Sequence, residues 1–429
     1  MFFHHVVSLI IAFGLACTIP MPACAEPAAG DAIPAYSAID ELALKTPAEA
    51  ETSVESLVKY LTSGARNDLE KTRAIFRWVT ANIAFDPSAL GATSPQKVDV
   101  NQILKEKRTI CMGYSEIFYI LGKAAGLEVE RIAGFARGFT TANGSPCNSP
   151  PNHEWNAVKI DGEWKLIDCT WGTGYMEPGP KFVKRYEEYY FCTPPEQFIF
   201  DHYPVDPNWQ LLPKPLSCQE YEQLAILKPA FFKYGLGLDS HHQPNLKATD
   251  PVEISFTAKQ DVIMLAQLTR GQEQLPRSYT FVEKDGDKMK VTAAFPQSGT
   301  YTLRLFAKPK TSTGTNCEWV AEYRIEVDSL PKPCVCFPES LTAFLELDAK
   351  LIAPRVGKLE SGTTQQFRVA VPGAKVVAVI SGKKWAYLQK AGDVFEGPVE
   401  VTSEPMQVCA NFGNSREYQV LLTYNKTTP

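Results

Sequence analysis

Apolar residues recur at helical spacing in two stretches of the first half of the chain. In residues 68–83, and again in residues 111–125, the apolar positions return about every 3.6 residues, as they do on one face of a helix. Gly126, directly after the second stretch, is a typical residue for ending a helix. We therefore predict two amphipathic helices, the second of which begins at Cys111.

Alternating apolar and polar residues follow the second helix. Residues 129–138 predict one strand, and residues 154–168 (E-W-N-A-V-K-I-D-G-E-W-K-L-I-D) predict a hairpin. Asp161 and Gly162 separate the two runs of the hairpin, and this pair is typical of a two-residue type I′ turn. A helix followed by antiparallel strands predicts an α+β domain.

The turn determines which side chains of the hairpin lie side by side. With a two-residue turn, Ile160 opposes Glu163, and in the same register Trp155 opposes Asp168. Opposed residues of an antiparallel pair share a face and side chains alternate, so His153 is a diagonal neighbour of Asp168. The two side chains are then within reach of a hydrogen bond, whereas a register shift of one residue would separate them.

From about residue 240 the chain reads as short strands separated by turns. Alternating runs recur at near-regular spacing up to residue 327, and further runs follow between residues 366 and 424. The segment from Pro331 to Pro333 marks a boundary between them. No internal repeat is close enough to recognise. The predicted units are an α+β domain with a helical lead-in over residues 26–235, a β-sandwich over residues 236–330 and a second β-sandwich over residues 331–429.

The first 25 residues have the composition of a targeting segment. An apolar run is followed by the small residues A-C-A, which end at Ala25 and are typical of a secretory cleavage site. Lipoprotein processing at Cys17 is the alternative. The apolar run is too short to span a bilayer. We therefore predict a signal peptide over residues 1–25 and a protein that is secreted, extracellular or periplasmic, with no integral membrane span.

Composition and charge narrow the classes of protein. The chain has 429 residues, of which 45% are hydrophobic and 21% charged, so it can form several globular cores. The net charge is −5 and no cluster of basic residues occurs, which argues against a nucleic-acid partner.

The cysteine count agrees with a single working thiol. Of 11 cysteines, Cys17 and Cys24 would leave with the signal peptide, and nine remain. Export favours disulfides, and an odd number leaves at least one thiol unpaired. With Cys111 free, four bridges could join Cys147, Cys169, Cys192, Cys218, Cys317, Cys334, Cys336 and Cys409.

Cys111 lies where a nucleophile would be activated. The N-terminus of a helix offers unpaired N–H groups and the positive end of the helix dipole, and both favour a thiolate over a thiol. The same N–H groups can receive an oxyanion. Gly113 would let substrate or a neighbouring strand approach closely. The alternative is that Cys111 is half of a disulfide or a small buried residue.

A thiolate enzyme needs a base, and few histidines are available. His241 and His242 lie in a polar linker, where a solvated role is expected. His153 and Asp168 form the pair that the hairpin brings together, and the carboxylate would fix the tautomer of the imidazole. The alternative is a structural hydrogen bond at the open end of the hairpin, or two exposed polar residues.

Two segments together resemble a known family. The sequence C-M-G-Y at residues 111–114 and the run H-E-W-N-A-V-K-I-D-G-E-W-K-L-I-D-C-T-W-G at residues 153–172 resemble the transglutaminase-like superfamily of papain-like fold, and within it the kyphoscoliosis peptidase branch. Residues 189–212 are similar to the segment that follows the core in this branch, and Ig-like β-domains follow there as well. The resemblance implies a catalytic triad of Cys111, His153 and Asp168.

Other residues are weaker candidates for the site. Trp155 and Trp171 lie near enough to wall a substrate cleft together with Gly113, although core packing is the simpler interpretation for the tryptophans. His202 could line the cleft or act as an alternative base, and a packed structural histidine is the competing interpretation. We find no metal-binding motif, because C-V-C at residues 334–336 has no partner pair, and we expect no cofactor.

The expected activity is cysteine-dependent processing of an amide. The thiolate attacks a carbonyl, an amine leaves, and a thioester remains for water or a second amine. The resemblance favours a peptidase or amidohydrolase acting on a protein or peptide. The alternatives are a cross-linking transglutaminase and a non-catalytic adhesin or scaffold, with the C-terminal β-domains binding a protein partner.

Overall fold

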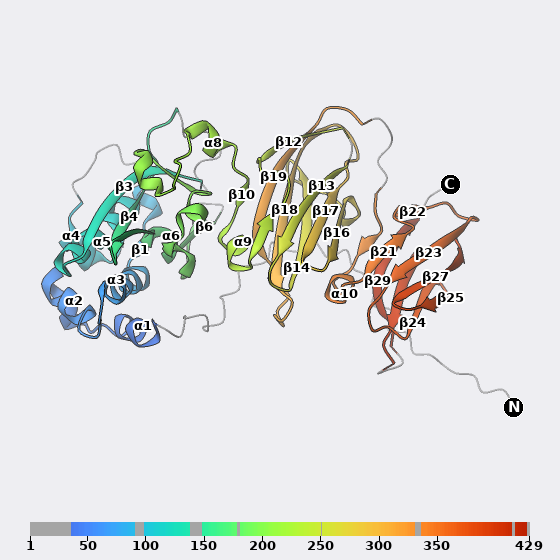
Figure 1. The fold of residues 1–429 in the computed structure, drawn as a ribbon, viewed down its shortest axis with the longest axis horizontal. Coiled ribbons are helices and arrows are strands. Elements are labelled where there is room, and N and C mark those ends of the chain that lie inside the picture. Colours follow the sequence, from blue (N-terminus) through green and yellow to red (C-terminus); the bar gives the residue numbers. More distant parts are fainter. Residues whose placement is uncertain are drawn as a thin grey trace.

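The computed structural model contains three units that follow one another along the long axis of the molecule (Figure 1). It describes residues 36–90, 98–137, 148–177, 181–249, 251–330, 336–413 and 417–426. The predicted signal peptide, Cys147, Cys334 and the predicted boundary at Pro331 to Pro333 lie outside these ranges. Within them, no helix is long and apolar enough to cross a membrane. An α+β domain comes first and two β-sandwiches follow, which confirms the predicted fold class.

The N-terminal domain packs helices against one antiparallel sheet of order β8-β5-β4-β3-β9. Its strands are β3 (Glu128–Ala136), β4 (His153–Ile160), β5 (Glu163–Ile167), β8 (Phe191–Thr193) and β9 (His202–Pro204). The short strands β1 (Ala84–Phe85) and β2 (Arg108–Thr109) pair in parallel, and β6 (Gly174–Glu177) pairs with β7 (Lys181–Lys184). The helices are α1 (Ser37–Leu44), α2 (Val54–Leu61), α3 (Asp68–Asn82), α4 (Val100–Glu106), α5 (Cys111–Ala124), α6 (Cys169–Thr173), α7 (Pro195–Phe198) and α8 (Cys218–Glu222).

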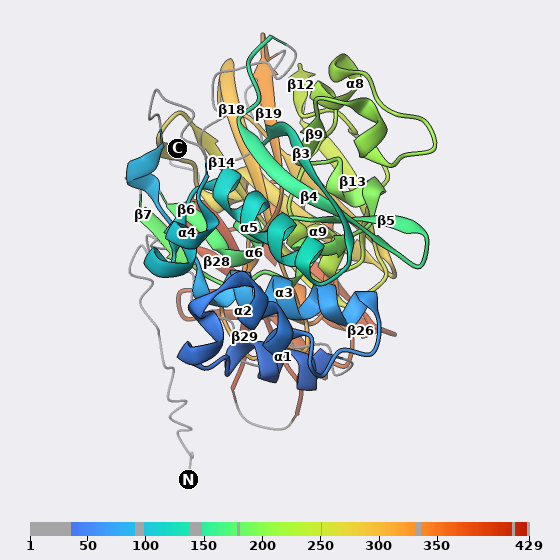
Figure 2. The same ribbon diagram turned by 90° about the vertical axis from the view of Figure 1, so that its left-hand side faces the viewer.

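The two predicted helices are confirmed as α3 and α5. The side chain of Asn67 caps α3 by accepting a hydrogen bond from the N–H of Glu70. The apolar face of α5 is buried, with Ile117, Phe118 and Leu121 fully enclosed. In Figure 2, α5 lies over β3 and β4, the two strands of the sheet that it contacts.

The predicted hairpin is confirmed together with its register. Ile160 pairs with Glu163, and Asn156 pairs with Ile167 at the other end. Asp161 and Gly162 have φ values of 51° and 83°, which are the left-handed conformations that a type I′ turn requires. The pairing ends there, one residue before Trp155 and Asp168, and Asp168 begins α6 instead.

The two β-sandwiches have the same strand topology, a repeat that the sequence did not reveal. In the first, the sheets have the orders β10-β19-β18-β14-β15, with β12 beside β19, and β11-β13-β17-β16. In the second, the orders are β20-β29-β28-β24-β25, with β22 beside β29, and β21-β23-β27-β26, so each strand number rises by ten. A short helix follows the first strand in both: α9 (Pro229–Lys233) and α10 (Thr342–Glu346).

The strands of the first sandwich are β10 (Ile226–Leu227), β11 (Leu236–Leu238), β12 (Asn245–Ala248), β13 (Val252–Ala258), β14 (Val262–Arg270), β15 (Glu273–Gln274), β16 (Thr280–Asp285), β17 (Lys288–Ala293), β18 (Gly299–Pro309) and β19 (Glu318–Val327). Those of the second are β20 (Glu339–Ser340), β21 (Lys350–Ala353), β22 (Lys358–Leu359), β23 (Thr364–Ala370), β24 (Val376–Ser381), β25 (Lys384–Tyr387), β26 (Gln389–Ala391), β27 (Val394–Glu400), β28 (Met406–Asn411) and β29 (Gln419–Lys426). The residue at which each predicted domain begins stays a prediction.

The short helix of each sandwich contacts the preceding unit. Phe232 of α9 lies against Tyr189 and Phe200 of the N-terminal domain, with ring centroids 5.9 Å and 5.5 Å apart. Phe344 of α10 lies 5.8 Å from Phe281 of the first sandwich. The same element therefore forms both junctions.

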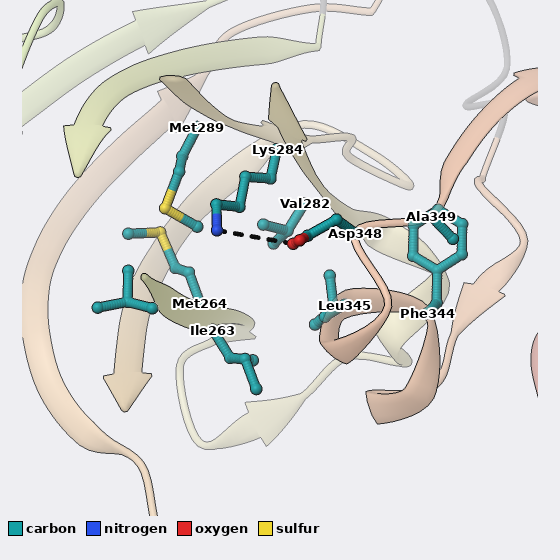
Figure 3. Close-up of a pocket in the computed structure, with 10 residues that line it drawn as sticks. Ile263, Met264, Val282, Lys284, Met289, Phe344, Leu345, Asp348 and Ala349 are labelled. Carbon is teal, nitrogen blue, oxygen red and sulfur yellow. Dashed lines mark ion pairs between the residues drawn. The ribbon is translucent and has the colours of Figure 1, made fainter. Parts of the chain in front are cut away.

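The second junction is closely packed. α10 contacts β14 and β16, and Figure 3 shows Lys284 of the first sandwich paired with Asp348 of the second, at 3.6 Å. The cavity left between them is about 10 Å³, roughly what one water needs. Side chains of both sandwiches therefore fill most of this junction.

The described cysteines do not form the four bridges that their number allowed. Cys218 is disulfide-bonded. Free thiols are found at Cys111, Cys169, Cys192, Cys317, Cys336 and Cys409. Five of the eight cysteines that could have formed four bridges therefore carry free thiols.

Candidate active site

Cys111 is the first residue of α5, directly after the short strand β2. The N-cap residue Ile110 provides no side-chain acceptor for the first turn, so the end of the helix keeps its N–H groups for another acceptor. The amide of Asn156 on β4 donates to the carbonyl of Ser115 at 3.0 Å and ties the first turn of α5 to the sheet. Cys111 is free and partly exposed.

Gly113 serves the packing of this turn. A Cβ atom at this position would lie 1.8 Å from Oγ1 of Thr109 on β2. Of the two roles predicted for Gly113, the structure supports the close approach of a neighbouring strand. The residue is buried against Thr109, and its assignment to a substrate cleft stays a prediction.

Asp168 uses its two carboxylate oxygens differently. Oδ1 accepts the backbone N–H groups of Thr170 at 2.7 Å and Trp171 at 3.0 Å, and so caps α6. Oδ2 faces two imidazoles, those of His153 at 2.7 Å and His202 at 3.0 Å. The carboxylate is fully buried, and the helix cap determines where its second oxygen points.

His153 lies between Asp168 and Cys111. It is the first residue of β4, and its side chain is 8% exposed. Nε2 is engaged by Asp168, and Cys111 is near enough to act on the pKa of the same ring. The remaining nitrogen, Nδ1, is the one left for another partner. Cys111, His153 and Asp168, which the resemblance implied as a triad, thus lie in one part of the domain.

The charges of His153 and Asp168 stabilise one another. Burial alone would lower the pKa of His153, but the charge and hydrogen bond of Asp168, followed by those of Cys111, outweigh it and raise the pKa to about 10. Burial alone would raise the pKa of Asp168, and the two histidines hold it well below its usual range. The arrangement favours an imidazolium beside an ionised carboxylate.

His202 belongs to the same network, and the sequence did not predict its partners. Nδ1 of His202 lies 2.6 Å from Oδ1 of Asp201, and Nε2 lies 3.0 Å from Oδ2 of Asp168. The hydroxyl of Tyr190 donates to Asp201 at 3.1 Å. The dipeptide Asp201-His202 in the run I-F-D-H-Y-P was the one sequence signal, a carboxylate adjacent to a histidine.

The tryptophans near the site differ in exposure. Trp155 is 1% exposed and covers Gly134 of β3. His202 is also enclosed. Trp155 and His202 therefore have the buried positions that core packing and a packed structural histidine predict, and a role of either residue in a substrate cleft stays a prediction. Trp171 is partly buried and lies 5.5 Å from His153, so it is placed to contact a substrate.

The other free thiols contrast with Cys111. Burial raises the pKa of Cys192 and of Cys409 to about 12 in each case, and that of Cys169 well above its usual value. Burial likewise raises the pKa of Cys317. These four thiols are poor nucleophiles. Cys111 alone among them has a histidine partner.

We find no cofactor geometry in the network. His153, Asp168 and His202 are the one group of this kind in the described ranges whose ligand atoms lie within 4.8 Å of one another. A nitrogen that donates its proton to Asp168 has no lone pair for a metal ion, and both Nε2 atoms lie at hydrogen-bond distance from that carboxylate. We therefore interpret the group as a hydrogen-bond network.

Comparison with known families agrees with this domain order. Residues 55–169 match the family model of the transglutaminase-like superfamily. Residues 218–338 match the model described as a KY-like, immunoglobulin-like domain. Cys111, His153 and Asp168 all lie within the first match.

Curated relatives resemble part of the chain. Kyphoscoliosis peptidase of Mus musculus is 32% identical over 60% of this chain and 39% of its own length. Lim and transglutaminase domain protein ltd-1 of Caenorhabditis elegans is 32% identical over 50% of this chain and 31% of its own. Hillarin of Drosophila melanogaster is 29% identical over 47% and 26%. The chain thus spans well under half of each relative.

Proposed function

We propose that this chain, which carries a transglutaminase-like domain followed by a KY-like immunoglobulin-like domain, is an exported cysteine-dependent enzyme that cleaves amide bonds in proteins or peptides. The observation that supports the proposal best is the position of His153, with Asp168 at 2.7 Å on one side and Cys111 on the other. The name of the related kyphoscoliosis peptidases favours hydrolysis.

The reaction follows from the groups at the site. His153 takes the proton of Cys111, and the thiolate forms a bond to the carbonyl carbon of the substrate. The N–H of Cys111 receives the oxyanion at the start of α5. His153 then gives its proton to the nitrogen, the C–N bond breaks, and an amine leaves a thioester on Cys111. Water completes hydrolysis, and a second amine would complete a cross-link.

Asp168 prepares His153 for both proton transfers. Its Oδ2 accepts the Nε2–H of His153, which directs Nδ1 towards the thiol, and its negative charge stabilises the imidazolium. Because α6 fixes the carboxylate through Oδ1, this direction is established before substrate binds.

Export is part of the proposal. It rests on the character of residues 1–25 and on the disulfide bond of Cys218, since disulfides persist in oxidising compartments.

The first test is selective alkylation of the intact protein by iodoacetamide without reductant. At about pH 6 an ordinary thiol reacts slowly because little thiolate is present. We expect Cys111 to react much faster than Cys192 and Cys409, and the His153→Ala variant to lose this preference. Peptide mapping by mass spectrometry measures each site. A Cys111 that reacts no faster than in His153→Ala would contradict the enzyme and favour a binding module.

The second test separates the two fates of the thioester. Casein peptides are incubated with the protein in the presence and absence of biotin-labelled cadaverine, with Cys111→Ser as the control. New peptide termini or deamidated glutamines indicate attack by water, and biotin on glutamine indicates attack by the amine. Hydrolysis products that depend on Cys111 are expected, and biotin incorporation without hydrolysis would favour a transglutaminase.

A further inference from the structure

A second buried imidazole faces the carboxylate of the candidate triad. His202 begins β9, and its side chain has no exposed surface. Each ring nitrogen lies at hydrogen-bond distance from a carboxylate, Nδ1 from Asp201 at 2.6 Å and Nε2 from Asp168 at 3.0 Å. An imidazole that donates from both nitrogens is positively charged, so two ionised carboxylates select the imidazolium of His202.

Aromatic rings surround this cation. The ring of Phe198 stacks on His202 at 4.0 Å, and Trp171 lies at 4.6 Å. The remaining ring neighbours are Trp155 at 5.0 Å, His153 at 5.4 Å and Tyr190 at 6.0 Å. Aromatic faces attract a cation, and they keep water away from it. The titratable groups that face His202 are Asp168, Asp201, His153 and Tyr190.

The network therefore alternates in charge over four side chains. The imidazolium of His153 is followed by the carboxylate of Asp168, the imidazolium of His202 and the carboxylate of Asp201. Because the side chain of His202 is enclosed, its influence on the reaction passes through Asp168.

We propose that His202 is a positioning residue of the proposed reaction, a buried imidazolium backed by Asp201 that keeps Asp168 ionised and oriented and weakens its hold on the proton of His153. The inference rests on the proposed function, since it concerns the same proton transfers. Without His202, the charge of Asp168 would act on His153 alone. His153 would then hold more strongly the proton that must pass to the leaving amine.

The test measures the proton affinity of His153 directly. The imidazoles of the full-length protein are labelled and followed by NMR against pH, with signals assigned by single substitutions. In His202→Phe, which retains a ring but no charge, the midpoint of His153 is expected to rise by about one pH unit. Asp201→Asn removes the carboxylate that keeps His202 charged, and this variant should also raise the midpoint of His153. If His202→Phe folds and the midpoint of His153 is unchanged or lower than in the wild type, the proposal is overturned.

Two further variants separate charge from packing. Phe198→Leu disturbs the ring that stacks on His202 without altering any titratable group, and it should leave the His153 midpoint unchanged. His202→Gln retains an amide that can donate to Asp168 but carries no charge. If His202→Phe does not fold, His202→Gln provides the test instead, and the midpoint of His153 is expected to rise by a similar amount.

The titration requires no substrate, so its result is independent of the proposed function. If Cys111 fails to alkylate selectively while the midpoint rises, the enzyme is contradicted and the electrostatic coupling of His202 to His153 is upheld. If Cys111 alkylates as expected and the midpoint does not rise, the enzyme is supported and the role of His202 is overturned.

Discussion

The carboxylate of Asp168 connects secondary structure to chemistry within one side chain. Its Oδ1 caps α6 directly after β5, and its Oδ2 lies at hydrogen-bond distance from the imidazoles of His153 and His202. A buried carboxylate with four donors is fully hydrogen-bonded. The position of His153 is therefore coupled to the local fold as well as to the pairing of β4 and β5.

The pH dependence of stability should report the proton on His153. Its pKa is about 10 in the folded protein, against 6.5 for an ordinary histidine. The stabilisation from this raised pKa is fully present below about pH 6.5, declines as the pH rises, and is lost above about pH 10. Urea unfolding of the wild type and His153→Gln should therefore differ most near pH 6, and the difference should shrink by pH 10. A difference that grows with pH would contradict the charged state.

Gly113 offers a test of how α5 is seated. In Gly113→Ala the new Cβ would overlap the side chain of Thr109, and we expect a loss of about 1–3 kcal/mol in the free energy of unfolding. The double variant with Thr109→Gly removes the overlapping atoms and should recover part of this loss. Urea denaturation of the wild type, the two single variants and the double variant measures the coupling between residues 109 and 113. If the losses of the two single variants simply add in the double variant, the overlap is relieved in another way.

Among single residues, the sequence predicted the one contact that the geometry of a short turn determines. The pair His153 and Asp168 followed from the Asp161-Gly162 turn because a two-residue loop fixes the register. His202 was not predicted as a partner of Asp168, since 34 positions separate them and the pairing of β9 with β3 has no local signal. Trp155, for which core packing was the simpler interpretation, lies over Gly134 because β3 pairs with β4.

Among the elements, α3 joins the N-terminal helix to the sheet through one buried arginine. Arg73 on α3 has no exposed side-chain surface. Its Nε and Nη2 donate to both oxygens of Asp40 on α1, at 2.6 Å and 2.7 Å. Nη1 and Nη2 also donate to Glu188, which begins the 3₁₀ helix at Glu188–Tyr190, at 2.6 Å and 2.8 Å.

Loss of Arg73 should therefore be costly. Arg73→Met leaves Asp40 and Glu188 without their counter-ion, and we expect a loss of about 3–5 kcal/mol in the free energy of unfolding. The matched control is Arg66→Ala, which removes an arginine whose side chain is 81% exposed although that of its partner Glu70 is only 7% exposed, and we expect a much smaller loss than in Arg73→Met. Equal effects in urea denaturation would show that burial does not distinguish the two pairs.

The elements that the sequence predicted are those with strong periodicity. The helices from Asp68 and Cys111 and the hairpin agree with the structure to within about one residue. Residues 277–279 form a 3₁₀ turn between Pro276 and β16, within the region that was predicted as short strands and turns. Short edge strands such as β15 and β26 have too few residues to show alternation.

For the whole molecule, the two sandwiches are joined through side chains that leave their own domain. Phe281 lies on the edge strand β16 of the first sandwich but is 1% exposed within the core of the second, with Phe337 at 5.6 Å. Arg355 of the second sandwich donates to both oxygens of Glu283 at 2.6 Å and 2.8 Å. These contacts fix the angle between the sandwiches.

Phe281→Ala should loosen this junction. A buried phenylalanine replaced by alanine costs about 3–5 kcal/mol, and here the loss falls on the contact between sandwiches. Small-angle X-ray scattering should show a broader distribution of molecular dimensions, with Tyr387→Ala, which alters a 62% exposed residue, as the control. An unchanged scattering curve would show that Glu283 and its partner suffice.

The shared topology of the sandwiches could not be predicted from the sequence. The short helices α9 and α10 read P-A-F-F-K and T-A-F-L-E, and only the central alanine and phenylalanine agree. Packing requires apolar residues of suitable volume, so two sequences can diverge widely and keep one strand order.

The pairing of β10 with β19 bears on how this protein can be divided for expression. Ile226 and Leu227 pair with the edge of the first sandwich although they precede α9, and the N–H of Lys228 adds a bond to Val320. An N-terminal fragment that ends at residue 235 would carry this strand away from its sheet, and a sandwich fragment that begins at residue 236 would present β19 with part of its edge unpaired. Unpaired strand edges recruit other chains, so cuts placed before residue 226 should give fragments that stay monomeric, and cuts after residue 235 should give fragments that aggregate.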